Sequence, residues 1–298
     1  MVPVGHATEP FQDEYISRCR QQLFNQIIQP CSSLLFAKQQ ADYVSSIQPS
    51  GFIFHLSRCG STLISGCLSE LDTTCVVSES PLLTELLLDK ALSIVEQQNC
   101  LRAFINLQAA AFPERPQMII KWNAWDIFCW ELIRDIYPQV PTIFLVRDPV
   151  EILASHQRSA GRHMSGDPSL VVINPAFQVG GQPLLTWRSN LLAALLGEMK
   201  KFSCDPLVRL VDYRYLDANQ IQQVAHHFLL PLDDVSIENI TRRLRFHSKT
   251  PEMIFSDDRS AKQALFSAED TLGIQQRLQP LYSDFLDDEA LDTEVVSP

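Results

Sequence analysis

Several features that would place this chain in a common class are missing from its sequence. No apolar run approaches the roughly 20 residues that a bilayer-spanning helix needs; one of the longest covers only residues 191–196. The first ten residues contain neither a basic start nor an apolar stretch, so no secretory signal is expected. We therefore expect a globular cytoplasmic protein that does not partner a membrane.

The chain also lacks an excess of positive charge and any C-x-x-C pair. Lys and Arg total 24 against 35 Asp and Glu, which gives a formal net charge of -11. Because phosphate-backbone binding needs clustered basic residues, we expect no nucleic-acid partner and a locally held anionic ligand. The eight cysteines are scattered along the chain, so we expect reduced thiols rather than disulfides. No spacing of cysteines and histidines predicts a metal site.

What the sequence does contain is a regular alternation of apolar runs and helical patterns. Five short runs cover residues 51–56, 74–78, 117–122, 141–146 and 207–211, and a helical pattern follows each. Continuous apolar character is typical of strands covered on both faces, and strand–helix alternation favours parallel pairing. The predicted fold class is α/β, with a mainly parallel, P-loop-type sheet flanked by helices.

The same patterns divide the chain into three parts. We expect an N-terminal helical extension packed on the domain (1–49), an α/β domain (50–283) and an acidic tail (284–298) beyond the last basic residue, Arg277. A first helix is expected over 11–29. Later helices are expected over 61–70, 81–111, 124–137, 148–161, 184–202, 217–229, 234–246 and 269–282.

The loop after the first apolar run has the residues of an anion site. It reads Ser57-Arg58-Cys59-Gly60-Ser61-Thr62. Gly60 allows close backbone approach, the two hydroxyls stand at a helix start, and Arg58 offers a planar donor fork. The Walker lysine is missing, because Gly60 is followed directly by Ser61 and Thr62. The loop therefore predicts phosphate or sulfate binding without requiring a metal.

Charged residues also stand at the ends of the other apolar runs. Glu79 follows the second run, Lys121 lies in the third and Arg147 follows the fourth. Since ligands of parallel sheets bind beyond the carboxyl ends of the strands, we expect these side chains to share one site. Asp148 and the residues after it form an N-terminal capping pattern, which puts Ser155 about two turns into the next helix.

The loop resembles the one that binds the 5′-phosphosulfate in sulfotransferases that use 3′-phosphoadenosine 5′-phosphosulfate (PAPS). In bacterial members and in tyrosylprotein sulfotransferases it reads approximately R-S-G-[ST]-T, and here Cys59 replaces the first Ser. Arg147 and Ser155 match the spacing of an Arg and a Ser that bind the 3′-phosphate in this family. The resemblance covers roughly residues 50–260, and it implies that residues 57–62 hold the cofactor.

The resemblance also suggests roles at the other strand ends. Glu79 corresponds by position to the catalytic base of tyrosylprotein and some carbohydrate sulfotransferases. Lys121 resembles the lysine after the third strand, which with Arg58 would stabilise the leaving group, although the following Trp122-Asn123 departs from the family pattern. Lys249 lies in a stretch similar to the late loop that closes over the cofactor.

The resemblance implies sulfuryl transfer from PAPS to a hydroxyl of a small-molecule acceptor, without a metal. A histidine base, His156 or His163, is an alternative to Glu79. A nucleotide-dependent kinase and a non-catalytic nucleotide-binding regulatory protein are alternative functions. A Mg²⁺ requirement would indicate the kinase, and binding without transfer would indicate the regulator. Neither the acceptor's identity nor the oligomeric state follows from the sequence.

Overall fold

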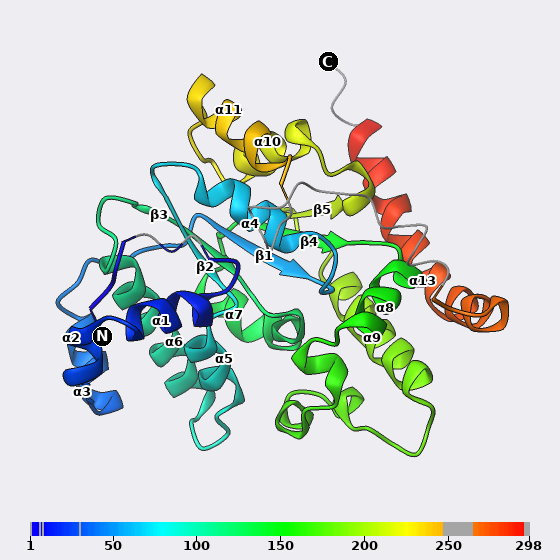
Figure 1. Cartoon of the computed structure of the whole chain (residues 1–298), viewed down its shortest axis with the longest axis horizontal. Coiled ribbons are helices and arrows are strands. Elements are labelled where there is room, and N and C mark those ends of the chain that lie inside the picture. The colour runs from blue at the N-terminus through cyan, green and yellow to red at the C-terminus, as the bar shows by residue number, and fades with distance from the viewer. Residues whose placement is uncertain (1, 6, 8, 30, 247–264, 295–298) are drawn as a thin grey trace.

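Five parallel strands form the centre of the molecule (Figure 1). The structure is a computed structural model that describes residues 2–5, 7, 9–29, 31–246 and 265–294, with side chains up to Leu286. The strand order is β2-β3-β1-β4-β5, and each neighbouring pair is parallel. The strands are β1 (Gly51–His55), β2 (Thr74–Ser78), β3 (Gln117–Lys121), β4 (Thr142–Val146) and β5 (Val208–Asp212). The predicted α/β class with a parallel sheet is confirmed.

Helices cover both faces of this sheet (Figure 1). Alternate residues of β1 point to opposite faces, as the period of a strand requires. Phe52 and Phe54 belong to the larger apolar core on one face of the sheet, whereas Ile53 belongs to a second core on the other face. The described helices of eight or more residues are α1 (Gln12–Arg20), α3 (Leu34–Ala41), α4 (Ser61–Ser69), α5 (Pro81–Leu88), α6 (Ile94–Ala110), α8 (Pro149–Arg158), α9 (Leu184–Lys201), α10 (Ala218–His227), α11 (Asp234–Arg243) and α13 (Ala268–Glu294).

Two helices predicted as continuous are divided in the structure. The predicted helix over 11–29 consists of α1 and α2 (Leu23–Ile27), and the Asn25 side chain crosses the break to donate to the Cys19 carbonyl at 2.9 Å. The predicted helix over 81–111 consists of α5 and α6. Ser93 and Glu96 form a reciprocal capping box, which gives α6 its own N-terminus. Apolar periodicity continues across both breaks, so it could not reveal them.

The predicted helix over 124–137 likewise begins as a 3-10 helix, η1 (Ala124–Cys129), before α7 (Trp130–Ile136). At the other end of the chain, α13 extends well past the predicted end at residue 282. Phe285 is fully buried in the larger core, and Lys200 donates to the Asp284 carbonyl at 2.7 Å. This packing accounts for the longer helix, which enters the segment that we predicted as an acidic tail.

Within the described ranges, no helix combines the length and the apolarity of a membrane-spanning segment.

Candidate functional site

The loop between β1 and α4 turns sharply through left-handed backbone. Ser57, Arg58 and Gly60 have φ angles of 65°, 53° and 90°. A Cβ atom on Gly60 would come within 2.5 Å of the Tyr213 ring, so glycine is needed here for both space and conformation. No side chain caps the N-terminus of α4, and its first N–H groups therefore face the loop as an anion site would require.

Glu79 lies directly beyond β2, at the same edge of the sheet. Its backbone is also left-handed, with φ of 51°, and its N–H donates to the Lys121 carbonyl at 2.7 Å. Its Oε1 atom is 3.1 Å from Lys121 Nζ and 3.4 Å from His55 Nε2. Burial by itself would raise the pKa of Glu79, but the neighbouring Lys121 and His55 outweigh it and lower the pKa to about 2. Glu79 is therefore an ionised carboxylate at neutral pH.

Lys121 connects this carboxylate to the anion loop and to the N-terminal segment. The residue is fully buried. Its ammonium lies 3.4 Å from Thr62 Oγ1 on α4, 3.5 Å from the Pro10 carbonyl and 4.9 Å from the centre of the Phe11 ring. The structure thus brings Glu79, Lys121 and Thr62 together, and the N-terminal segment covers them.

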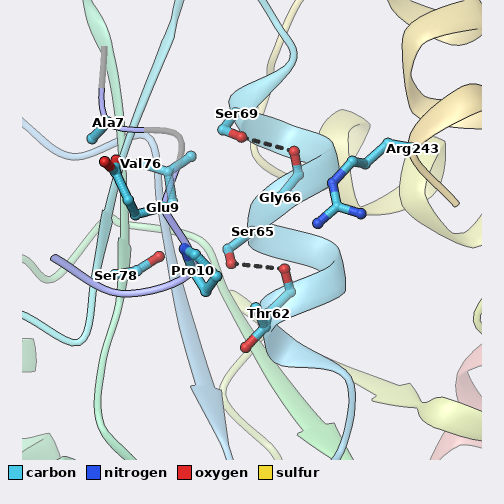
Figure 2. Close-up of a pocket in the computed structure, with 10 residues that line it drawn as sticks. All are labelled: Ala7, Glu9, Pro10, Thr62, Ser65, Gly66, Ser69, Val76, Ser78 and Arg243. Atoms are coloured by element: carbon cyan, nitrogen blue, oxygen red, sulfur yellow. Dashed lines mark hydrogen bonds between the residues drawn. The ribbon is translucent and has the colours of Figure 1, made fainter. Parts of the chain in front are cut away.

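A small pocket lies between the N-terminal segment and α4. Figure 2 shows Pro10 on one side of it and Thr62 on the other, with Arg243 on the far side of α4. Hydroxyls line much of this pocket, contributed by Thr62, Ser65, Ser69 and Ser78. Since Thr62 also contacts Lys121, the pocket adjoins the carboxylate site.

Arg147, at the end of β4, is directed to the anion loop. Its Nη1 atom donates to the Arg58 carbonyl at 3.1 Å, and its Nε atom donates to Glu151 at 2.6 Å. Its guanidinium lies 4.0 Å from the centre of the Tyr213 ring. Ser155 is half-buried two turns into α8. Arg147 therefore supports the loop, and Glu151 occupies part of its donor fork.

The remaining predicted site residues lie in different environments. Arg58 donates to the Ser159 carbonyl at the end of α8 at 2.6 Å; burial lowers its pKa, and the charge of Glu79 opposes this effect. Cys59 is fully buried, and burial raises the pKa of its thiol to about 12, so it is no nucleophile at neutral pH. Ser61 is buried at the first turn of α4. Lys249 lies outside the described residues.

Two ionisable residues near the site, His55 and Asp126, did not follow from sequence patterns as members of it, whereas His163 was predicted as an alternative base. His55, the last residue of β1, accepts from the Ser57 N–H at 2.9 Å. Asp126 in η1 accepts a hydrogen bond from the backbone N–H of Asn123. Burial nevertheless raises the pKa of Asp126 to about 7. Burial lowers the pKa of His163 to about 3. The charge of His55 also lowers this pKa, and the charge of Glu79 opposes the shift. For His55, the available signal in the sequence was a histidine near the end of an apolar run.

The predicted histidine alternatives, His156 and His163, are in contact with each other. The rings of His156 and His163 are 5.2 Å apart, and His163 also contacts Trp125 at 5.6 Å. His55, in contrast, accepts a hydrogen bond from the Ser57 N–H of the anion loop. His55 thus contacts both the loop and Glu79.

No protein-family model matches the sequence, and no curated protein matches it. Solved structures do match. The sulfotransferase domain from the curacin biosynthetic pathway is 14% identical with a TM-score of 0.50, over 79% of this chain and 99% of that domain. The sulfotransferase STF9 from Mycobacterium avium is 11% identical with a TM-score of 0.52, over 86% of this chain and 81% of the enzyme.

At such low identities the likeness concerns the backbone arrangement, including the parallel sheet and the helices that flank it. Both matched proteins are sulfotransferases, and both alignments span more than three quarters of each chain. The chain therefore has the P-loop-type α/β fold of the sulfotransferases.

Proposed function

We propose that this protein is a sulfotransferase that moves a sulfuryl group from PAPS to a hydroxyl of a small molecule. The observation that carries the proposal is the position of Lys121 Nζ, 3.1 Å from Glu79 Oε1 and 3.4 Å from Thr62 Oγ1. A buried ammonium lies between a carboxylate and the helix start of an anion loop. This arrangement combines a proton acceptor with stabilisation of a departing anion.

The residues present fit the donor at its two phosphate positions. The uncapped start of α4 and the left-handed loop with Gly60 suit the 5′-phosphosulfate. Arg147 and Ser155 on the neighbouring β4–α8 unit suit the 3′-phosphate, with Glu151 exchanged for phosphate as the partner of Arg147. The two sets of groups come from different elements, and together they would hold the donor at its 5′-phosphosulfate and at its 3′-phosphate.

The proposed reaction forms a bond between the acceptor oxygen and sulfur and breaks the bond between sulfur and the bridging phosphate oxygen. Glu79 accepts the proton of the acceptor hydroxyl. Lys121 and the α4 N–H groups stabilise the charge on the departing phosphate oxygen. As Lys121 turns toward that oxygen, Glu79 loses the contact that most lowers its pKa and becomes a stronger base when the proton transfers.

The first test is calorimetric binding of 3′-phosphoadenosine 5′-phosphate (PAP) without metal, beside ATP with Mg²⁺. Wild type is compared with Arg147→Ala and with Arg20→Ala, which removes an exposed arginine from α1. We expect metal-free binding of PAP, weakened by at least tenfold only in Arg147→Ala. A preference for Mg-ATP would contradict the proposal and indicate a kinase.

The second test is transfer from PAPS to a panel of phenols, sugars and aliphatic alcohols, detected as release of PAP. Glu79→Gln keeps the shape of the side chain and removes its basicity, so we expect turnover to fall by about 10²-fold or more. Glu238→Gln, at an exposed position of α11, is the matched control. PAP binding without transfer to any acceptor would favour the regulatory alternative.

A further inference from the structure

We propose that His55 is a positioning residue that couples the conformation of the anion loop to the orientation of the Glu79 carboxylate. The inference rests on the proposed function, in which that loop holds the donor and Glu79 accepts the proton. His55 is almost completely buried at the end of β1, with only 3% of its surface exposed. Its two ring nitrogens contact the two parts of the site.

The first contact determines which nitrogen carries the proton. The Ser57 N–H lies 2.9 Å from His55 Nδ1. A backbone N–H can only donate, so Nδ1 must accept, and the proton of the neutral ring is then on Nε2. The loop backbone thereby selects the tautomer of the histidine.

The second contact brings the other ring nitrogen, Nε2, close to the carboxylate without a hydrogen bond between them. Nε2 lies 3.4 Å from Glu79 Oε1, a distance longer than an ideal hydrogen bond. Catalytic hydrogen bonds are often long before ligands bind and shorten in the complex. Lys121 contacts the same Oε1 atom at 3.1 Å. When Lys121 turns to the donor, His55 is left as the group that orients Glu79.

Both residues joined by the ring have unfavourable backbone conformations. Ser57 and Glu79 have φ angles of 65° and 51°, a left-handed region that is sterically unfavourable for residues other than glycine. The Ser57 N–H donates to His55, and the carbonyl of the following residue, Arg58, accepts from Arg147. A change in the loop would therefore rotate or release the ring, and with it the Nε2 atom that lies beside Glu79.

Two substitutions separate the two contacts. In His55→Asn, the amide oxygen can replace Nδ1 as acceptor for Ser57, but the shorter side chain does not reach Glu79. In His55→Gln, the longer amide can donate to Glu79, but it provides no acceptor at the Nδ1 position. His226→Asn, at an exposed position of α10, is the control, and thermal melting verifies that each variant is folded.

We expect His55→Asn to bind PAP within about twofold of wild type and to lose about tenfold or more in kcat. We expect His55→Gln to lose about tenfold in PAP affinity and to retain more of its kcat at saturating PAPS than His55→Asn does. Equal losses of affinity and kcat in both variants would overturn the proposal, since they would indicate that the ring acts only through packing.

A third measurement does not depend on transfer. The ¹⁵N chemical shifts of the His55 ring, assigned by the loss of its signals in His55→Gln, report the tautomer directly. We expect the Nε2–H form in wild type. The Nδ1–H form would refute the coupling even if the protein transfers sulfuryl groups. Absence of PAP binding in wild type would instead refute the proposed function, and the tautomer would still show whether the ring accepts from the loop, which the coupling requires.

Discussion

Glu79 and Lys121 come from the ends of two neighbouring strands, and their side chains form an ion pair of 3.1 Å at the edge of the sheet. The pairing extends to the backbone, because the Glu79 N–H donates to the Lys121 carbonyl at 2.7 Å. Register explains the proximity, since Ser78 of β2 is opposite Lys121 of β3. The carboxylate is thus fixed beside a buried cation by the pairing of two strands.

The ion pair of Glu79 and Lys121 makes the stability of the fold depend on pH. The pKa of Glu79 is lowered from 4.5 to about 2 in the fold, so its contribution to stability is present above pH 4.5 and is lost as the pH falls toward 2. Glu79→Gln lacks this contribution at every pH. We therefore expect the difference in melting temperature between wild type and Glu79→Gln to be largest near pH 7 and to shrink below pH 4.5. A difference that grows on acidification would show that the pKa of Glu79 is not lowered.

Gly60 provides a test of the loop geometry. Gly60→Ala places a methyl group 2.5 Å from the Tyr213 ring and forces alanine into a φ of 90°. We expect a loss of about 1–3 kcal/mol in the free energy of unfolding, measured in urea, together with weaker PAP binding. Gly197→Ala is the control: no atom crowds its site within α9, so we expect no loss of stability there. Equal effects of the two substitutions would argue against the tight loop.

Glu151 competes with any phosphate for Arg147. Its carboxylate accepts from Arg147 Nε at 2.6 Å, and it adds negative charge where the 3′-phosphate is proposed to bind. We expect Glu151→Gln to raise PAP affinity by several-fold, because like-charge repulsion is removed while the helix cap from Asp148 is kept. Calorimetry beside the exposed control Glu238→Gln measures this. Unchanged or weaker binding would place the 3′-phosphate elsewhere.

The N-terminal segment shields the buried ammonium. The Phe11 ring lies 4.9 Å from Lys121 Nζ, and the Pro10 carbonyl is 3.5 Å away. We expect Phe11→Ala to increase the acetylation rate of Lys121 by several-fold, measured by mass spectrometry under native conditions, because solvent and reagent gain access. Phe24→Ala, which changes an exposed ring on α2, should leave that rate unchanged. An unchanged rate in Phe11→Ala as well would mean that other residues shield Lys121.

The strands could be predicted from the chain because they are buried on both faces. All five residues of β1, β2 and β4 are buried, and their continuous apolar runs mark them within one residue of their ends. The helix breaks over residues 21–22 and 89–93 could not be predicted in the same way. They depend on side-chain hydrogen bonds that apolar periodicity does not record.

The order of residues along the chain was enough to indicate an α/β sheet, an anion loop before a helix, and charged residues at the carboxyl ends of several strands. These features are local, since they depend on burial pattern, capping and turn residues within short segments. The meeting of His55, Glu79 and Lys121, and the position of Pro10 and Phe11 over them, come from strand order and from contacts between segments up to 111 residues apart. Such contacts form only when the sheet assembles, so tertiary packing specifies them and no local pattern does.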